Sequence, residues 1–586
     1  MTSESGVERG SGAALHDHGA GDVLAIEDAE GRTRLIQATS EQTLAQVLFL
    51  EGLWPTKPFC SGLGRCGHCL VYVVDDSEPS PNTPTTDERK TLSPEVLEQG
   101  GRLACRRQSE SGLRVRLPFA FPRTAAESAA AFESNGIALE RAVSGSLALA
   151  VDLGTTSLHW QLLDDKGVLA QGRELNPQLA AGSEVMSRLG FALAAPGNAR
   201  MLRDVVLRRL HELTMALPAP VDRICVAGNT VMTALLLEWP LKGLAAAPYQ
   251  KPHAGGFWTR LPFQETSLEL SDHHAPGNAE GRHGGRTYIP PQPAPFIGGD
   301  LSAGLAALHF TAASPPAFPF LLADLGTNGE FILALGQERY LAASVPMGPA
   351  LEGIGMSCGA TALPGVWVDV VVTPFGLRPR PLEDPDGGNS DTGGTEHIDV
   401  PRSKPDRQRI SGTGYLALLA GLLRLGLLDR TGGFAAGDSP LARRVGLGLA
   451  DRDGERRFLL GPDVYLTGRD VEEVLKVKAA FNLAFSRLLA EGGIQPEALR
   501  AVYLAGALGE HADFSALEEL GFVPPGYRRR IHPVGNSSLA GAALLVNSPE
   551  ARDWIERIAP MITTLNIGQE PDFFSHYTQR LVFRHV

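Results

Sequence analysis

The sequence has no apolar run long enough to cross a bilayer. Its most apolar stretch, residues 415–428, is interrupted by Arg424 and has the composition of a buried helix. Residues 1–22 lack the apolar core of a signal peptide; they are polar and glycine-rich, which predicts a disordered tail. These two absences predict a cytoplasmic protein.

Positive charge is also in short supply. The 586 residues contain 53 lysines and arginines against 66 aspartates and glutamates, a net charge of −13. This balance argues against broad binding to nucleic acid or to a membrane surface, because both need basic faces. A hydrophobic fraction of 43% and a charged fraction of 20% are ordinary for a globular protein, and the length predicts two to four domains.

Cysteine is scarce, but four of the six cysteines lie in one segment. Cys60, Cys66 and Cys69 have the spacing C-x5-C-x2-C, and Cys105 follows far downstream. Three thiolates from one glycine-rich loop and a fourth from a distant position can hold a [2Fe–2S] cluster, and the spacing resembles that of the adrenodoxin-like ferredoxins. Structural zinc, which usually shows two C-x2-C pairs, is the main alternative. A disulfide pattern is disfavoured by the missing signal peptide, and His68 is interpreted as a surface residue.

The surrounding segment predicts a small domain over residues 23–118, interpreted as a β-grasp [2Fe–2S] ferredoxin domain. We expect a hairpin over residues 23–37, a helix over residues 41–51 with Ser40 as its N-cap, and a strand over residues 70–74. Five arginines surround the fourth cysteine and either steer an acidic redox partner or line a solvated sheet edge. They are Arg102, Arg106, Arg107, Arg114 and Arg116.

The longer part of the chain carries a repeated acidic turn. The motif Asp-Leu-Gly-Thr occurs at residues 152–155 and again at residues 324–327, each time between two strand-like runs. Turns of this type expose backbone N–H groups and hydroxyls that suit phosphate oxygens. The leading aspartate is placed to hold a divalent cation or to orient a water molecule.

The repeat extends beyond these turns. Residues 224–229 and 502–507 are apolar strands that end in Ala-Gly, and residues 298–308 and 535–545 are glycine loops that lead into Ala/Leu-rich helices. Three matched pairs in the same order predict a duplicated α/β unit whose two lobes face each other across a cleft. This organisation resembles the actin, sugar-kinase and Hsp70 (ASKHA) superfamily of ATP-binding proteins. The fold class is therefore expected to be multidomain α/β, with actin-like lobes over residues 146–310 and 319–586.

One nucleotide site is expected between the lobes. Asp152 and Asp324 are the candidates for acting on Mg²⁺-ATP from opposite walls, and Glu330 is a further candidate for orienting water. Glu352 either contacts the ribose or cation or caps a helix, and Ser411 and Thr413 likewise meet a ligand or cap a helix. The candidate nucleotide-binding residues are Gly154, Thr155, Thr156, Gly326, Thr327, Asn328, Gly348, Glu352, Gly506, Gly535 and Asn536.

Less structured segments separate these units. Residues 119–145 predict a linker, and residues 377–409, rich in Pro, Gly, Asp and Arg, predict a disordered insertion. Residues 268–286 contain three histidines, which allow a metal site but without helical spacing favour a loop. The isolated Cys225 and Cys358 are expected to be small buried hydrophobic residues.

A [2Fe–2S] domain joined to duplicated actin-like lobes resembles the RACo family, the reductive activators of corrinoid proteins. The resemblance rests on the four-cysteine set, the two Asp-Leu-Gly-Thr turns, residues 348–353, residues 505–507 and residues 535–538. It implies that one electron passes from the cluster to Co(II) of a corrinoid methyltransferase protein, coupled to ATP hydrolysis.

The resemblance also implies which partners the protein binds. The expected partners are a corrinoid protein and an upstream electron donor, and a homodimer is left open. Two alternatives remain: an ATP-dependent reductase of another low-potential acceptor, and a small-molecule kinase of the same superfamily with a regulatory ferredoxin domain.

Overall fold

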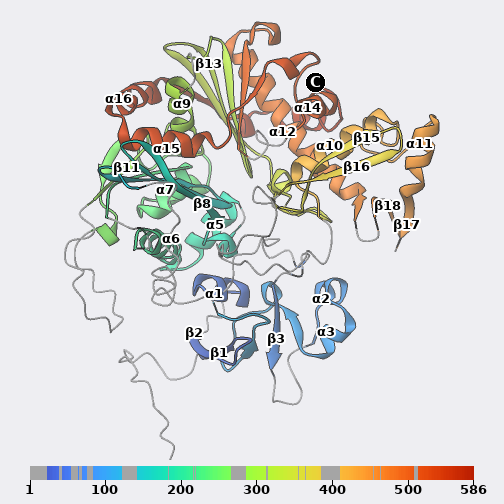
Figure 1. Ribbon diagram of the computed structural model, residues 1–586, viewed down its shortest axis with the longest axis horizontal. Coiled ribbons are helices and arrows are strands. Elements are labelled where there is room, and N and C mark those ends of the chain that lie inside the picture. The colour runs from blue at the N-terminus through green and yellow to red at the C-terminus, as the bar shows by residue number, and fades with distance from the viewer. Residues whose placement is uncertain are drawn as a thin grey trace, which may run out of the picture.

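The computed structural model describes residues 23–37, 42–53, 64, 67, 69–74, 83–121, 142–182, 184–215, 217, 220–264, 285–311, 315–353, 355–362, 364–383, 409–452, 454–461, 464–506 and 512–586. The expected disordered tail, most of the expected linker, Cys60, Cys66 and His68 lie outside these residues. Figure 1 shows the N-terminal strands and helices grouped beneath a larger body of two lobes. Within the part described, no helix is both long enough and apolar enough to cross a membrane.

The N-terminal unit is a mixed sheet with strand order β2-β1-β5-β3-β4. Its elements are β1 (Val23–Glu27), β2 (Thr33–Gln37), α1 (Leu44–Leu50), β3 (Leu70–Val74), α2 (Thr86–Thr91), α3 (Pro94–Glu98), β4 (Gly101–Leu103) and β5 (Arg114–Arg116). The expected start of α1 at residue 41 is wrong. The N-cap is Thr43, whose hydroxyl accepts a hydrogen bond from the Gln46 backbone N–H while the Gln46 side chain accepts one from the Thr43 N–H.

The first lobe is built on a six-stranded sheet with order β10-β11-β9-β6-β7-β8. Its strands are β6 (Leu147–Leu153), β7 (Ser157–Asp164), β8 (Gly167–Leu175), β9 (Val221–Gly228), β10 (Phe257–Thr259) and β11 (Arg286–Ile289). Its helices are α5 (Val185–Ala194), α6 (Asn198–Met215), α7 (Thr230–Leu236), α8 (Lys242–Ala245) and α9 (Gly299–Thr311). Every residue of β6 is buried, as expected for a strand covered on both faces.

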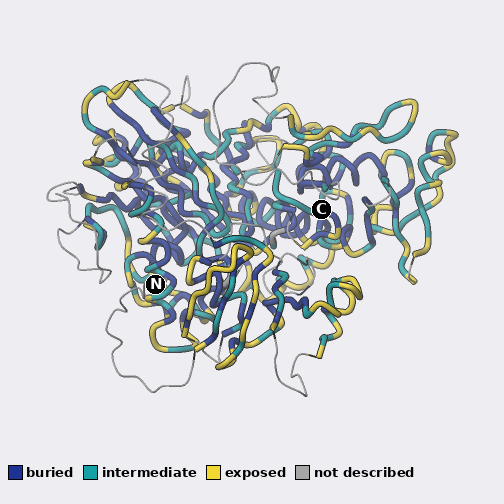
Figure 2. Tube along the Cα trace, turned by 60° about the horizontal axis from the view of Figure 1, so that its bottom comes forward, coloured by how far each residue is buried: buried dark blue, intermediate teal, exposed yellow. Residues whose placement is uncertain are grey.

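The second lobe repeats this plan with order β21-β20-β12-β13-β14-β22. Its strands are β12 (Phe320–Leu325), β13 (Asn328–Gly336), β14 (Arg339–Pro346), β20 (Ala501–Ala505), β21 (Ile531–Pro533) and β22 (Ile562–Leu565). Its helices include α10 (Gly412–Arg424), α12 (Gly468–Gly492), α14 (Phe514–Leu520), α15 (Ser537–Asn547), α16 (Pro549–Ile558) and α17 (Phe573–Thr578). Figure 2 shows buried residues gathered within the two lobes, where the large hydrophobic clusters lie.

The lobes meet through α9 and α15, which pack against each other. Glycine makes the close approach feasible: a Cβ on Gly541 would lie 2.0 Å from the Ala303 carbonyl oxygen, and one on Gly304 would lie 2.6 Å from Ser537 Oγ. These two helices are the matched glycine-loop helices of the repeat, so the duplicated elements form the contact between the lobes.

An extension of the second lobe contains β15 (Trp367–Thr373), β16 (Gly376–Pro381), α11 (Pro440–Val445), β17 (Leu449–Arg452), β18 (Glu455–Leu459) and β19 (Tyr465–Thr467). The expected disordered insertion from residue 377 is wrong in its first residues, because β16 pairs with β15 through register partners such as Val371 and Arg378. Residues 384–408 lie outside the described part. Most of the histidine-containing segment expected as a loop also lies outside it, although Arg286 begins β11.

Candidate functional site

The two acidic turns face each other across the cleft. Residues 154–156 connect β6 to β7, and residues 326–327 connect β12 to β13. The hydroxyls of Thr156 and Thr327 lie 3.2 Å apart, which joins the two lobes directly. A cavity of about 670 Å³ opens between the turns. This volume is within the range of small-molecule and cofactor sites.

The structure brings most of the predicted nucleotide-site residues to this one cavity. The predicted residues that line it are Asp152, Gly154, Thr155, Thr156, Asp324, Gly326, Thr327, Asn328, Glu330, Glu352, Gly506 and Asn536. Gly348 and Gly535 lie behind the lining. Gly348 N–H donates to the Thr327 carbonyl at 2.9 Å, and the Gly535 carbonyl accepts from Gly506 N–H at 2.9 Å.

Asp152 is held by side chains of the opposite lobe. Its Oδ1 accepts a hydrogen bond from Ser538 Oγ at 2.8 Å, and its Oδ2 accepts one from Asn536 Nδ2 at 2.8 Å. Asn536 is also the N-cap of α15. His159 Nδ1 lies 3.2 Å from Asp152 Oδ2 and 2.7 Å from Asn536 Nδ2. The first acidic turn is therefore tied to the helix that joins the lobes.

Asp324 and Glu330 face each other across β12 and β13. Burial and the nearby charge of Asp152 raise the pKa of Asp324 to about 7. Burial, together with the charges of Asp300 and Asp324, raises the pKa of Glu330 well above its usual value. Asp300, in the first turn of α9, has a pKa raised by burial and by Asp324. Carboxylates placed this way repel each other, and a cation among them would relieve the repulsion.

No trio of His, Cys, Asp or Glu side chains among the described residues is arranged to hold a metal by itself. Mg²⁺ usually keeps several waters and takes one or two carboxylates plus substrate phosphates. Asp324 and Asp152 are the residues that would hold it.

Glu352 lines the cleft and is bonded to the second turn. Its Oε1 accepts a hydrogen bond from Thr327 Oγ1 at 2.9 Å, whereas its buried Oε2 has no hydrogen-bond partner. Burial raises the pKa of this carboxyl. Glu352 ends a 3-10 turn (η4, Pro349–Glu352) and does not cap a helix at its N-terminus. Ser411 does, because its Oγ accepts from Gly414 N–H at the start of α10.

In the ferredoxin domain, the described cysteines Cys69 and Cys105 are neighbours. Their Sγ atoms lie 3.3 Å apart, much longer than a disulfide bond of about 2.05 Å. Two thiols at this spacing fit ligation of a common metal centre. Cys225 and Cys358 lie in the lobes and are buried, as expected.

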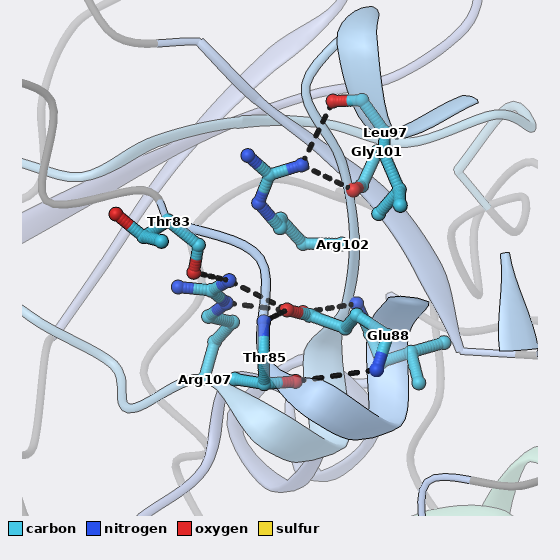
Figure 3. A network of polar contacts seen from close by, with 8 residues as sticks. Thr83, Thr85, Glu88, Leu97, Gly101, Arg102 and Arg107 are labelled. Carbon is cyan, nitrogen blue, oxygen red and sulfur yellow. Dashed lines mark hydrogen bonds and ion pairs between the residues drawn. The ribbon is translucent and has the colours of Figure 1, made fainter. Parts of the chain in front are cut away.

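A buried carboxylate, Glu88, bonds Leu103 and Arg107, which lie on either side of Cys105 in the sequence, and Figure 3 shows it beside Arg107 and Thr85. Glu88 on α2 is 0% exposed, and it accepts hydrogen bonds from Leu103 N–H at 2.9 Å and Arg107 Nη2 at 2.6 Å. Burial alone would raise the pKa of Glu88, but these donors together with Thr85 N–H hold the pKa below its usual value. The segment carrying the fourth cysteine is thereby fixed on both sides of Cys105.

The arginines near Cys105 are mostly engaged within the domain. Arg102 is buried and donates to the carbonyls of Leu97 and Gly101, so placing it on a solvated edge or steering surface was wrong. Arg106 forms an ion pair with Asp87, and Arg107 forms one with Glu88. Arg114 and Arg116 are exposed on β5.

Sequence reasoning missed Asp300, His159 and Glu88. Asp300 had a signal, because it directly follows the Gly-Gly of the matched glycine loop. His159 and Glu88 had none, because tertiary packing brings His159 to Asn536 and Glu88 to the Leu103 N–H.

The comparisons with known proteins agree with this construction. Residues 28–108 match the 2Fe-2S iron-sulfur cluster binding domain, residues 147–313 match the RACo middle region, and residues 319–586 match the C-terminal domain of RACo, the ASKHA domain. The chain thus joins a domain of the 2Fe-2S ferredoxin type to an ASKHA domain. It belongs to the RACo family.

Individual relatives cover most of the chain. It is 27% identical to the corrinoid activation enzyme RamQ of Eubacterium limosum, over 74% of this chain and 70% of the relative. It is 28% identical to the [Co(II) methylated amine-specific corrinoid protein] reductase of Methanosarcina barkeri, over 71% of this chain and 72% of the relative. The solved structure of a reductive activator for corrinoid,iron-sulfur protein has the same fold, with a TM-score of 0.61, 23% identity, and coverage of 96% of this chain and 98% of that one.

Proposed function

We propose that this protein is an ATP-dependent reductive activator of a corrinoid protein. The observation that carries the proposal is the presence, in one chain, of a [2Fe–2S] domain and a two-lobed cleft lined with converging carboxylates and hydroxyls. Both relatives described above act on corrinoid proteins, as their names state. A reduced [2Fe–2S] cluster held by Cys60, Cys66, Cys69 and Cys105 would supply the one electron that converts Co(II) of the partner to Co(I).

The need for ATP follows from the potentials. Plant-type clusters lie at about −400 mV, and the family resemblance implies that the cobalt couple lies lower. Each 100 mV uphill costs about 2.3 kcal/mol per electron. ATP hydrolysis in the cleft offsets this cost if movement of the lobes changes the cobalt coordination in the docked partner and so raises its potential.

The residues for the nucleotide are proposed from the geometry of the cleft. The hydroxyls and N–H groups of residues 154–156 and 326–328 bind phosphate oxygens from opposite sides. Asp324 holds Mg²⁺ or orients the attacking water, and Asp152 acts on the same Mg²⁺-nucleotide from the first lobe. Glu330 lies opposite Asp324 on the neighbouring strand, and its pKa is raised in part by the charge of Asp324. The protonation states of these two carboxyls therefore depend on each other.

The residues for the cluster are Cys60, Cys66, Cys69 and Cys105. Iron and sulfide analysis after anaerobic purification checks this set. Cys69→Ala and Cys105→Ala should lose the cluster absorbance, whereas Cys225→Ala and Cys358→Ala, in the lobes, should keep it. Zinc in place of iron would contradict the assignment.

The partner should dock on the ATPase lobes, because ATP must act on the cobalt site. An upstream donor would reload the ferredoxin domain. The test adds candidate Co(II) corrinoid proteins to the purified protein and measures ATP turnover. Stimulation by one corrinoid protein supports the proposal. If no corrinoid protein changes the rate of ATP turnover and the protein instead phosphorylates a small molecule, the kinase alternative is supported.

A further inference from the structure

The ferredoxin domain is docked on the first lobe through α1. Helix α1 packs against α6 and against a 3-10 turn, η2 (Leu179–Ala181). Figure 1 shows α1 directly beneath the helices of this lobe. Leu50 of α1 is part of the hydrophobic core cluster of the first lobe, and Leu179 of η2 is part of the core cluster of the ferredoxin domain. Each unit therefore inserts one leucine into the other.

The segment that receives the ferredoxin domain is bonded to the first acidic turn. Asn176, which is 0% exposed, donates from Nδ2 to the Gly154 carbonyl at 2.7 Å and from its backbone N–H to the Thr156 carbonyl at 2.9 Å. The Asn176 carbonyl in turn accepts from Leu179 N–H at 3.1 Å. Only two residues separate the side chain that holds the turn from the leucine that docks the ferredoxin domain.

Arg188 connects the same parts a second time. It is fully buried, and its Nη2 donates to the carbonyls of Thr155 at 2.8 Å and Gly182 at 2.7 Å. Its Nη1 donates to Gln178 Oε1 at 3.1 Å. One guanidinium thus fixes the acidic turn to both ends of η2.

Leu175, at the end of β8, touches both sites. It lines the nucleotide cavity, and it also packs against the core cluster of the ferredoxin domain. A ligand in the cleft and the docked domain therefore share a side chain.

In this state, with the ferredoxin domain docked, the two acidic turns contact each other directly. Thr156 Oγ1 and Thr327 Oγ1 lie 3.2 Å apart. A phosphate oxygen that accepts from both hydroxyls, at about 2.7 Å from each, replaces the hydrogen bond between them, so the first turn is then held by the phosphate in place of Thr327. Because the Thr156 carbonyl is bonded to Asn176, movement of this turn displaces Asn176 and, with it, Leu175 and η2.

We propose that residues 175–182 couple the nucleotide site to the docking of the ferredoxin domain, so that nucleotide binding releases that domain from the first lobe. This inference rests on the proposed nucleotide site and adds a way in which ATP controls where the cluster resides. Thermodynamic linkage requires reciprocity: if the nucleotide weakens docking by some factor, docking weakens nucleotide binding by the same factor. Typical coupling of this kind is about 5- to 150-fold.

The test uses the full-length protein with its cluster and the non-hydrolysable analogue AMP-PNP with Mg²⁺. Leu179→Asp and Leu50→Asp place a charge in the interface from its two sides, and neither residue lines the cleft. Leu193→Asp, at an exposed leucine of α5 in the same lobe, is the matched control. Cluster absorbance and circular dichroism verify that each variant is folded, and Leu179→Ala serves if an aspartate variant is not.

Two measurements are made on each variant. Calorimetry should show AMP-PNP binding at least about five-fold tighter in Leu179→Asp and Leu50→Asp than in the wild type, with Leu193→Asp unchanged. Hydrogen exchange of residues 44–50 should increase when AMP-PNP binds the wild type. In the two interface variants it should be fast from the start and insensitive to AMP-PNP.

The outcomes distinguish failure of the coupling from failure of the proposed nucleotide site. AMP-PNP that binds the wild type, both interface variants and the control equally well, with unchanged exchange in α1, overturns the coupling and leaves the nucleotide site standing. AMP-PNP that fails to bind the wild type removes the proposed nucleotide site and the coupling together.

Discussion

The two lobes share one sheet plan, yet their acidic turns have different surroundings. In each lobe a glycine approaches the turn closely: Gly228 ends β9, and Gly506 directly follows β20. A Cβ on Gly228 would lie 2.9 Å from the Leu153 carbonyl oxygen, and one on Gly506 would lie 2.9 Å from the Leu325 carbonyl oxygen. The duplication therefore extends to single atomic contacts. The aspartates differ, because Asp152 accepts hydrogen bonds from Ser538 and Asn536 of the opposite lobe.

Asp324 has a different environment. It faces Asp152, Asp300 and Glu330, and burial and charge raise its pKa to about 7. From these different surroundings we infer a division of roles, in which the first turn mainly connects lobes and domains and the second carries the reactive carboxylates. The predictions below test this division.

The largest effect is expected at the two aspartates. Asp324→Asn should lower ATP turnover by about a hundred-fold or more, because it removes the charge that holds Mg²⁺ or the attacking water. The loss of ATP turnover in Asp152→Asn should be at least ten-fold smaller than in Asp324→Asn. An asparagine carbonyl at position 152 can still accept one of the hydrogen bonds from Ser538 or Asn536. Both variants should keep the cluster absorbance. Equal losses would show that the turns are not specialised.

A smaller effect is expected at Gly506. Its φ of +79° is unfavourable for other residues, and a Cβ would lie 3.2 Å from Asp324 Oδ1. Gly506→Ala should raise the KM for ATP about ten-fold by displacing Asp324, beyond a backbone strain of about 1–2 kcal/mol. Gly526→Ala is the control, since Gly526 has a φ of +88° with no atom within 4 Å of its Cβ position. An unchanged KM for ATP in both variants would show that Gly506 does not contribute to the nucleotide site.

Glu352→Gln should have a still smaller effect. Glutamine retains an oxygen that accepts the Thr327 hydroxyl, but it removes a buried charge from the lining of the cleft. We expect nucleotide affinity to change only a few-fold, about 1 kcal/mol or less, measured by calorimetry. A loss as large as that of Asp324→Asn would add Glu352 to the reactive carboxylates.

The smallest effect is on stability and depends on pH. The folded protein holds a proton on Asp324 up to about pH 7, whereas the unfolded chain loses it near its ordinary value of 3.8. The folded state thus binds more protons across this window, so stability falls as pH rises from about 4 to 7. Asp324→Asn should remove this loss and raise the Tm at pH 8 by a few degrees, since about 1 kcal/mol corresponds to about 2–4 °C. At pH 4 the two proteins should melt alike, and a lower Tm for the variant at pH 8 would contradict the raised pKa.

The local features of this fold could be predicted from the sequence. The strands, the turns and the matched order of elements follow from hydrophobic periodicity and from glycine, aspartate and threonine at fixed offsets. The hairpin of the ferredoxin domain is confirmed by the pairing of β1 with β2. The family and its two kinds of unit are confirmed by the matches over residues 28–108, 147–313 and 319–586.

Features that depend on tertiary contacts could not be predicted. His159 reaches Asn536 only when β7 meets α15, and Glu88 gains its role only when α2 meets Leu103 and Arg107. The start of the insertion was misjudged because residues 376–381 have the composition of a loop, while their strand is imposed by pairing with β15. The docking of α1 depends on packing of single leucines, which periodicity does not reveal.

One measurement tests the central claim most directly. The protein, chemically reduced, is mixed without oxygen with a Co(II) corrinoid protein from the same organism, and the Co(I) absorbance is followed with Mg²⁺-ATP, with AMP-PNP and without nucleotide. The account predicts that Co(I) forms with ATP alone among these conditions and that neither Cys105→Ala nor Asp324→Asn forms it. The account would be contradicted if Co(I) formed equally well without ATP. It would also be contradicted if Co(I) formed with none of the corrinoid proteins of that organism.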